Sequence, residues 1–210
     1  MKPNPFAPDS LESTLIQSAQ DSVRFALACL EPFNGHLRAI SSFVNPEAEI
    51  MHWHDFGDLE GPGWAANAIG GAHLLYRWGS YTGDPAVQDQ ALLLAGHVLE
   101  DGFIDPKTGF IWPYYELAEK RFCLNYRHND DWLCPGSLAK IGVQLLGFAD
   151  ALPGGSGSKA MEEAALGLAH WLRDHTPLLP NGWVPRRITR AGQAYPLSPA
   201  GRRRAPQHRH

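Results

Sequence analysis

A repeat with an offset of 73 residues is the sequence feature that most constrains how this chain folds. Pro62 and Gly63 coincide with Pro135 and Gly136 when the chain is shifted by 73 positions without a gap. The same shift aligns further identical residues: Asp58 with Asp131, Ala91 with Ala164, His97 with His170, Leu99 with Leu172, and Asp101 with Asp174. A match over this length predicts two copies of one structural unit, at about 58–112 and 131–185.

Each copy carries two helical patterns and therefore predicts a helical hairpin. Apolar residues recur at helical spacing in five segments of the chain: about 10–31, about 62–78, about 84–101, a segment that begins at Pro135, and about 158–175. Asp84 followed by Pro85 is typical of a helix start. Short extended segments at 109–111 and 182–184, each a glycine, an aromatic and a β-branched residue, follow the hairpins.

The two helices of each unit differ in composition, which predicts an inner and an outer layer. The segment 62–78 is rich in alanine and glycine, and glycine inside a helix costs about 1 kcal/mol unless close packing requires it. The segments 84–101 and 158–175 carry a polar face that suits contact with water. We therefore expect the second and fourth helices inside and the third and fifth outside.

The hairpins, the Asp-containing segments that lead into the inner helices and the Gly-aromatic segments resemble the (α/α) toroid of six-hairpin glycosidase-like enzymes. That group includes unsaturated glucuronyl hydrolases and N-acylglucosamine 2-epimerases. The resemblance covers about residues 10–190 at the level of architecture, and no catalytic motif of one family matches. It implies an all-α fold, an incomplete (α/α) toroid of helical hairpins with short β segments between them.

The resemblance also implies how the chain is divided. Residues 1–9 form an N-terminal arm, residues 10–190 the helical domain, and residues 191–210 an irregular basic tail. A closed toroid needs more hairpins than the five expected helices provide. The expectation is therefore that the chain is the N-terminal part of a larger toroid, ended by truncation or by a shifted reading frame near position 200.

Composition and charge exclude several classes of function. No apolar run reaches the roughly 20 residues of a membrane span, and the start of the chain has no signal-peptide pattern, which predicts a cytoplasmic protein without membrane contact. All 22 acidic residues lie at or before Asp174, while seven of the 18 Lys and Arg lie from Arg186 onward. The acidic body argues against nucleic-acid binding. The three cysteines share no CxxC spacing, so reduced thiols are expected.

Two Asp-containing segments, 52–61 and 126–134, should meet on one face because both lead into inner helices. Glycoside hydrolysis needs one carboxyl group as acid and another as base or nucleophile. Asp55 and Asp130 are the first candidates, because the repeat does not pair them. Asp58 and Asp131 are further candidates, although a carboxylate recurring just before a helix also suits a purely structural role.

The same segments and the aromatic-rich stretch 112–132 supply candidates for sugar binding, since aromatic side chains with polar tips suit sugar rings. Packing of the loop against the helix ends is the alternative. The candidate substrate-binding residues are Trp53, His54, Trp112, Tyr115, Tyr126, Arg127, His128 and Trp132. Arg186 and Arg187 are possible partners of an acidic sugar.

His52 and His54 lie two residues apart, a spacing that allows a metal site with Asp55 or Asp58, but without a third strong ligand the sequence favours no metal. Phosphate-binding, dinucleotide-binding and serine-hydrolase motifs are absent from the sequence, so no cofactor is expected. The sequence thus predicts a carbohydrate-processing domain, glycoside hydrolase-like or sugar epimerase-like. The alternative is a non-catalytic helical scaffold or truncated fragment, which binds a protein or sugar without turnover and self-associates through exposed inner-helix surface.

Overall fold

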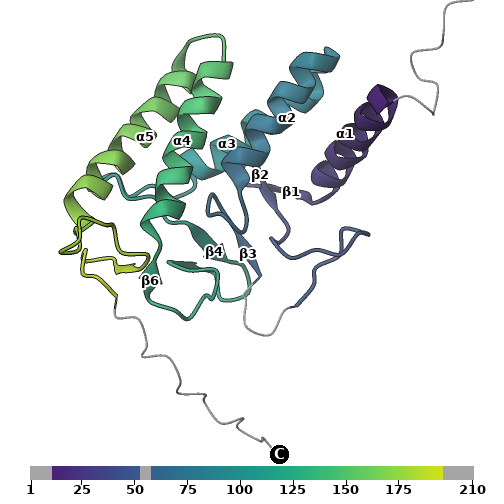
Figure 1. The fold of residues 1–210 in the computed structure, drawn as a ribbon. Coiled ribbons are helices and arrows are strands. Elements are labelled where there is room, and N and C mark those ends of the chain that lie inside the picture. The colour runs from purple at the N-terminus through teal and green to yellow at the C-terminus, as the bar shows by residue number, and fades with distance from the viewer. Residues whose placement is uncertain (1–10, 53–57, 196–210) are drawn as a thin grey trace, which may run out of the picture.

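The computed structural model describes residues 11–52 and 58–195, which form five helices and seven short strands (Figure 1). The helices are α1 (Leu11–Ala28), α2 (Ala68–Thr82), α3 (Pro85–Glu100), α4 (Pro135–Ala151) and α5 (Ser156–His175). The strands are β1 (Leu30–Phe33), β2 (His36–Ala39), β3 (Leu59–Glu60), β4 (Tyr114–Glu116), β5 (Arg121–Cys123), β6 (Trp132–Leu133) and β7 (Ile188–Thr189). Among these residues, no helix is both long and apolar enough to cross a membrane.

The expectation of an all-α incomplete toroid is wrong, because the fold is mixed α and β. Its strands form three small antiparallel sheets, β1-β2, β3-β4-β5 and β6-β7. They gather at one end of the helices (Figure 1). The Tyr-Tyr-Glu and Arg-Phe-Cys segments of β4 and β5 pair with each other, with Tyr114 opposite Cys123. Aromatic residues favour a pleated, half-buried surface, and here that preference produces sheets rather than loops between hairpins.

Strand pairing repeats with the 73-residue offset found in the sequence. In the β3-β4-β5 sheet Leu59 lies opposite Glu116 and Glu60 lies opposite Tyr115. In the last sheet Trp132 lies opposite Thr189 and Leu133 opposite Ile188, which are the same pairs shifted by 73 positions. In both copies, the strand before the inner helix thus pairs with a strand that follows the outer helix.

Two of the predicted helix starts are confirmed. The Oδ1 atom of Asp84 accepts hydrogen bonds from the backbone N–H groups of Ala86 and Val87, at 3.0 and 3.3 Å, and caps α3. Helix α4 begins at Pro135. The predicted start at Pro62 is wrong, because α2 begins only at Ala68.

The late start of α2 and the early end of α1 have local backbone causes. Asn67, directly before α2, has φ +55°, and the Gly63 N–H donates to the Pro113 carbonyl at 2.7 Å, so residues 61–67 form a turn docked on β4. Helix α1 ends at Ala28 because β1 and β2 form a hairpin whose loop is Asn34-Gly35, with φ +48° and +83°. An Asn-Gly pair is a strong signal for a two-residue hairpin loop.

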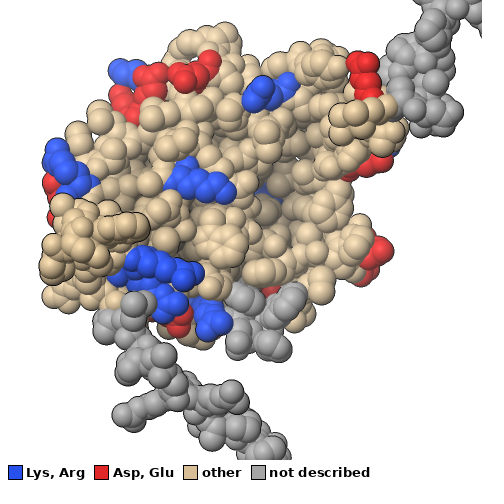
Figure 2. Space-filling view, viewed as in Figure 1, with Lys and Arg blue, Asp and Glu red and all other residues tan. Residues whose placement is uncertain are grey.

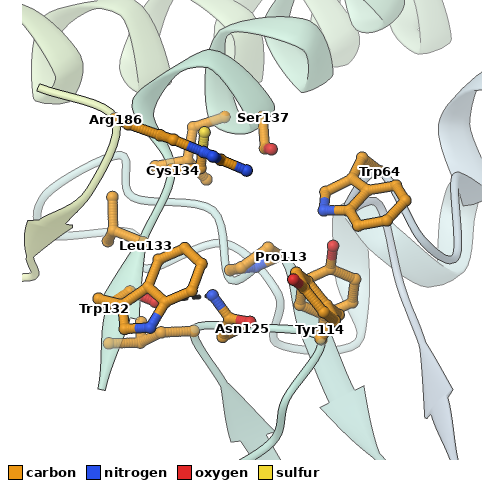
Figure 3. Close-up of a pocket in the computed structure, with 12 residues that line it drawn as sticks. Trp64, Pro113, Tyr114, Asn125, Trp132, Leu133, Cys134, Ser137 and Arg186 are labelled. Carbon is orange, nitrogen blue, oxygen red and sulfur yellow. Dashed lines mark hydrogen bonds between the residues drawn. The ribbon is translucent and has the colours of Figure 1, made fainter. Parts of the chain in front are cut away.

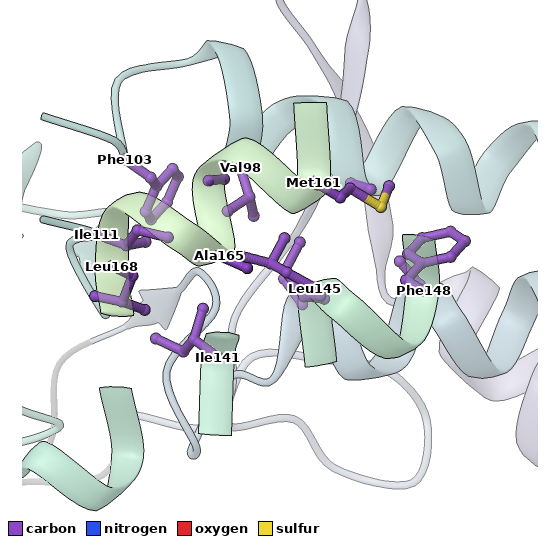
Figure 4. Packing of buried hydrophobic residues seen from close by; sticks show 14 of the residues in the cluster. Val98, Phe103, Ile111, Ile141, Leu145, Phe148, Met161, Ala165 and Leu168 are labelled. Atoms are coloured by element: carbon purple, nitrogen blue, oxygen red, sulfur yellow. The ribbon is translucent and has the colours of Figure 1, made fainter. Parts of the chain in front are cut away.

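One apolar core holds the two helical hairpins together. Helix α2 packs against α3, α4 against α5, and the two pairs meet through α2 and α4. Ile141 and Leu145 of α4 and Leu168 of α5 have no exposed surface, and they pack in a cluster with Ile111 and Phe148 (Figure 4). Burial of this apolar surface is the main term that favours the folded state.

Gly109 and Gly167 allow the segment after α3 to lie directly on α5. Gly109 has φ +73°, and a Cβ atom at this position would lie 2.7 Å from the Gly167 backbone. A side chain at Gly109 would therefore combine an unfavourable backbone conformation with a clash against another segment's backbone. Gly83 has a similar φ, +70°, but open space where its Cβ would lie.

We expect Gly109→Ala to lower the free energy of unfolding by about 3 kcal/mol, from backbone strain plus overpacking. The matched control, Gly83→Ala, should cost only about 1 kcal/mol, because strain alone remains. Urea unfolding followed by circular dichroism measures both values. Equal costs for the two variants would contradict the close approach of the two backbones.

A buried ionic network joins α3 to β3 and to the β1-β2 hairpin. The His97 side chain, 2% exposed, contacts Glu60 through Nε2 at 2.8 Å and Asp101 through Nδ1 at 2.7 Å. Asp101 also contacts His36 Nδ1, at 2.9 Å. Burial acts to lower the pKa of His97, but the hydrogen bonds and charges of Glu60 and Asp101 outweigh it and raise the pKa above its ordinary value. The raised pKa favours the imidazolium form of His97, with one carboxylate on each ring nitrogen.

The raised pKa of His97 makes part of the stability depend on pH. The stabilisation is complete below the unfolded-state pKa, about 6.5, and is lost as the pH rises through the folded-state pKa. Comparing His97→Gln with the natural chain by urea unfolding from pH 5.5 to 9 should show the largest stability difference at the acidic end. A difference that stays constant over this range would contradict an imidazolium at position 97.

Candidate functional site

A cavity of about 220 Å³ lies at the N-terminal end of α4, beside β6 (Figure 3). Its aromatic lining comes from Trp64, Tyr114, Tyr126 and Trp132. Its polar lining comes from Asn125, Cys134, Ser137 and Arg186, and its remaining lining residues are Pro113, Leu124, Leu133 and Leu138. In Figure 3, Arg186, Cys134 and Ser137 lie on the side of α4, and Trp64, Tyr114, Asn125 and Trp132 lie on the other sides. The cavity therefore combines aromatic and polar groups in a small volume.

The wall opposite α4 is held by close packing of Tyr114 against the turn before α2. The Tyr114 hydroxyl accepts a hydrogen bond from the Ala65 N–H at 3.3 Å, and burial raises the pKa of this phenol well above its ordinary value. A Cβ atom on Gly63 would lie 2.4 Å from the Tyr114 ring. Only glycine at this position lets the turn place Trp64 at the rim of the cavity.

The loop 124–131 is anchored by Asn125, which is 3% exposed. The Asn125 side chain donates from Nδ2 to the Trp132 carbonyl at 3.3 Å and accepts at Oδ1 from the Arg127 N–H at 3.0 Å. One side chain thus holds both ends of the loop. This fixes Tyr126, whose ring lies edge-on to Trp64 at 5.2 Å between centroids.

The Trp132 side chain is held at its indole N–H and on one face of its ring. Its indole Nε1–H donates to Asp130 Oδ2 at 2.9 Å, and the Arg187 guanidinium lies 4.1 Å from the ring centroid. Such cation–π contacts contribute about 0.5 to 2 kcal/mol. Because β6 also pairs with β7, the backbone of Trp132 is held as well. Trp132 is therefore a rigid wall of the cavity.

The predicted acid and base residues are not brought together in the cavity. Asp130 accepts a hydrogen bond from the Trp132 indole. Asp131 is hydrogen-bonded to the Tyr195 hydroxyl, and this contact raises the pKa of Tyr195. Asp58 contacts His52 Nδ1 at 3.2 Å. None of these three carboxylates lines the cavity, and Asp55 lies outside the described residues.

Two of the predicted substrate-binding residues, Tyr126 and Trp132, line the cavity. Four others lie elsewhere in the structure. Trp112 stacks on Phe122, Tyr115 points to the opposite face of its sheet, Arg127 is exposed, and His128 bonds to Asn129. Trp53 and His54 lie outside the described residues. Alternation along a strand explains Tyr115, because its neighbour Tyr114 faces the cavity.

The sequence patterns did not indicate Trp64, Asn125, Cys134 and Ser137 as lining residues, and they indicated Arg186 only as a partner for an acidic sugar. Trp64 was not predicted at the site, because the segment after Pro62 was expected to be helical. Cys134 and Ser137 flank Pro135, and a proline that starts a helix next to short polar residues was the available signal. The position of Arg186 at the cavity follows from the pairing of β6 with β7, which the sequence did not reveal.

Comparison with known proteins gives no further assignment. No model of a known protein family matches the chain, and no curated protein matches it. The described residues contain no group of three or more His, Cys, Asp or Glu side chains arranged to hold a metal ion.

Asp130 acts on the cavity through Trp132, and a double-mutant cycle tests this link. We expect Asp130→Ala to cost about 1 kcal/mol of unfolding free energy, the usual contribution of one hydrogen bond. In a Trp132→Phe background, which lacks the indole N–H, the same substitution should cost close to nothing. Urea unfolding gives all four values, and an equal cost in both backgrounds would contradict the Asp130–Trp132 link.

Proposed function

We propose that this chain binds a carbohydrate in the cavity between Trp64 and Trp132. The observation that carries the proposal is the arrangement of three aromatic side chains, Trp64, Tyr126 and Trp132, around polar groups in a volume of about 220 Å³. This volume lies below the roughly 300–1,000 Å³ of pockets for larger ligands, which favours a single sugar ring. Aromatic surfaces accept the apolar face of the ring, and polar groups fix its orientation.

The polar groups around the cavity favour an acidic sugar. Ser137 and Asn125 supply hydrogen-bonding groups for hydroxyls, and Arg186 supplies a guanidinium that pairs well with a carboxylate. Figure 2 shows Lys and Arg side chains gathered at the strand end of the molecule, near β6. A positive surface there attracts an anionic ligand toward the cavity.

Turnover of the bound sugar, by glycoside hydrolase-like or epimerase-like chemistry, is a second proposal, and the position of Asp130 favours it. Asp130 lies one hydrogen bond from the Trp132 indole and is the carboxylate most directly linked to the cavity wall. Its Oδ1 atom makes no hydrogen bond to any residue that the structure describes. Because Asp130 does not line the cavity, it would act as a general acid or base through one bridging water.

Two further proposals concern the surroundings of the protein. All three cysteines are free thiols, which supports a reducing compartment such as the cytoplasm. Apolar side chains are exposed on α2 and α4, including Leu74 at 65% and Val143 at 68%. A surface of this kind supports self-association of the chain.

Calorimetric titration with a neutral hexose and with the matching uronic acid tests the binding proposal. We expect the uronic acid to bind more tightly, and Trp64→Ala to weaken binding by about tenfold, because an aromatic anchor at a binding site contributes 1 kcal/mol or more. Arg186→Ala should remove the preference for the acid. Trp183→Ala is the matched control, since Trp183 is 72% exposed and does not line the cavity. Affinity that Trp64→Ala leaves unchanged would place the sugar elsewhere.

Asp130→Asn separates turnover from binding, because the amide oxygen still accepts a hydrogen bond from the Trp132 indole. With a substrate identified by the titrations, turnover should fall about 100-fold or more while affinity is retained. Unchanged turnover would leave Asp130 as a positioning residue only.

A further inference from the structure

A second cavity of about 310 Å³ lies on the other face of the β3-β4-β5 sheet. Successive side chains of a strand point to opposite faces, so Tyr114 lines the first cavity and Tyr115 the second. The second cavity is walled by Phe33, Phe103, Tyr115 and Phe122, and its other lining residues are Asn34, Glu60, His97, Asp101 and Lys120. The cavity therefore has an aromatic wall on one side and the buried ionic network of Glu60, His97 and Asp101 on another.

Glu60 leaves one carboxylate oxygen unused at this cavity. The side chain is 2% exposed, and its Oε2 contacts His97 at 2.8 Å. Its Oε1 accepts no hydrogen bond from any part of the chain that the structure describes, and its charged neighbour is Arg38 Nη1 at 3.9 Å. Arg38 is engaged by Glu31, which it contacts at 2.8 Å. Because Oε1 makes only this long ion pair and Glu60 lines the cavity, the oxygen is available to accept a hydrogen bond from a ligand there.

The charges around the cavity favour a cation over a neutral donor. Glu60 and Asp101 both contact His97, so this triad sets two carboxylates against at most one positive charge. Its further neighbours are His36, 2.9 Å from Asp101, and Arg38, 3.9 Å from Glu60. Arg38 and Glu31 balance each other. Hydrogen bonds from His97, His36 and Asn34 outweigh burial and lower the pKa of Asp101, which therefore stays ionised. Lys120 lines the cavity as an exposed residue, so solvent screens its charge.

We propose that this cavity binds a small organic ammonium ion, whose N–H group donates to Glu60 Oε1 and whose hydrocarbon part packs between Phe33, Tyr115 and Phe122. Aromatic rings attract cations through their negative faces, and a buried carboxylate adds a charge-assisted hydrogen bond. Since Arg38 already lies 4.2 Å from the centroid of the Phe33 ring, Tyr115 and Phe122 supply the aromatic faces for the cation, and Phe33 supplies apolar contact. The inference is independent of carbohydrate binding, because the two cavities lie on opposite faces of one sheet and share no lining residue.

Titration of the full chain with cyclohexylammonium and with cyclohexanol at pH 7 tests the proposal by calorimetry. The two probes have the same ring and differ in charge. We expect cyclohexylammonium to bind at least about tenfold more tightly, because only the ammonium ion compensates the Glu60 carboxylate. Equal affinity for the two probes, or no binding of the ammonium ion, would overturn the proposal.

Variants then locate the site. Glu60→Gln keeps the shape of the side chain and should weaken cyclohexylammonium binding at least about tenfold. Tyr115→Leu, on the rim, should also weaken it and serves if Glu60→Gln fails to fold, as judged by circular dichroism. Lys120→Gln should leave binding equal or tighter, since it removes a like charge. Trp64→Ala, in the other cavity, is the matched control and should leave ammonium binding unchanged. A loss of ammonium binding in Trp64→Ala would overturn the assignment. Unchanged affinity in Tyr115→Leu, or in Glu60→Gln that folds, would overturn it as well.

Discussion

Antiparallel pairing between the strand before each inner helix and a strand after each outer helix is the constraint on which the rest of the structure depends. Two residues on each side suffice, Leu59 and Glu60 in the first copy and Trp132 and Leu133 in the second. The paired backbone closes each helical hairpin at one end. Both cavities use the β3-β4-β5 sheet as a wall, so their positions follow from the same pairing.

Much of the helical frame was predictable, because its signals are local. Asp84 with Pro85 and the proline at position 135 mark helix starts by side-chain chemistry and fixed φ alone. The fold class was not predictable in the same way, since strands of two to four residues are too short to show alternation. Asn34-Gly35 is the exception, because this pair is a hairpin signal that the sequence itself carries.

The candidate site was predictable only in part, for a related reason. Aromatic density around Trp132 indicated a loop that lines the cavity. The pairing of acids across a cleft could not be predicted, because it depends on which neighbours the carboxylates bond. Asp130 bonds to an indole two residues away and Asp131 to the hydroxyl of Tyr195, a partner far along the chain. Strand alternation then divided the adjacent tyrosines 114 and 115 between two cavities, a separation that composition does not reveal.

The shift of 73 positions that maps one sheet onto the other also maps Glu60 onto Leu133. Both side chains are fully or almost fully buried at the same register position, yet one is a charge that recruits His97 and the other is hydrocarbon. His170, the counterpart of His97, is accordingly exposed. The repeated backbone thus tolerates opposite chemistries at one internal position, so the two halves of the chain keep a common architecture while the interiors beside their short sheets differ in charge.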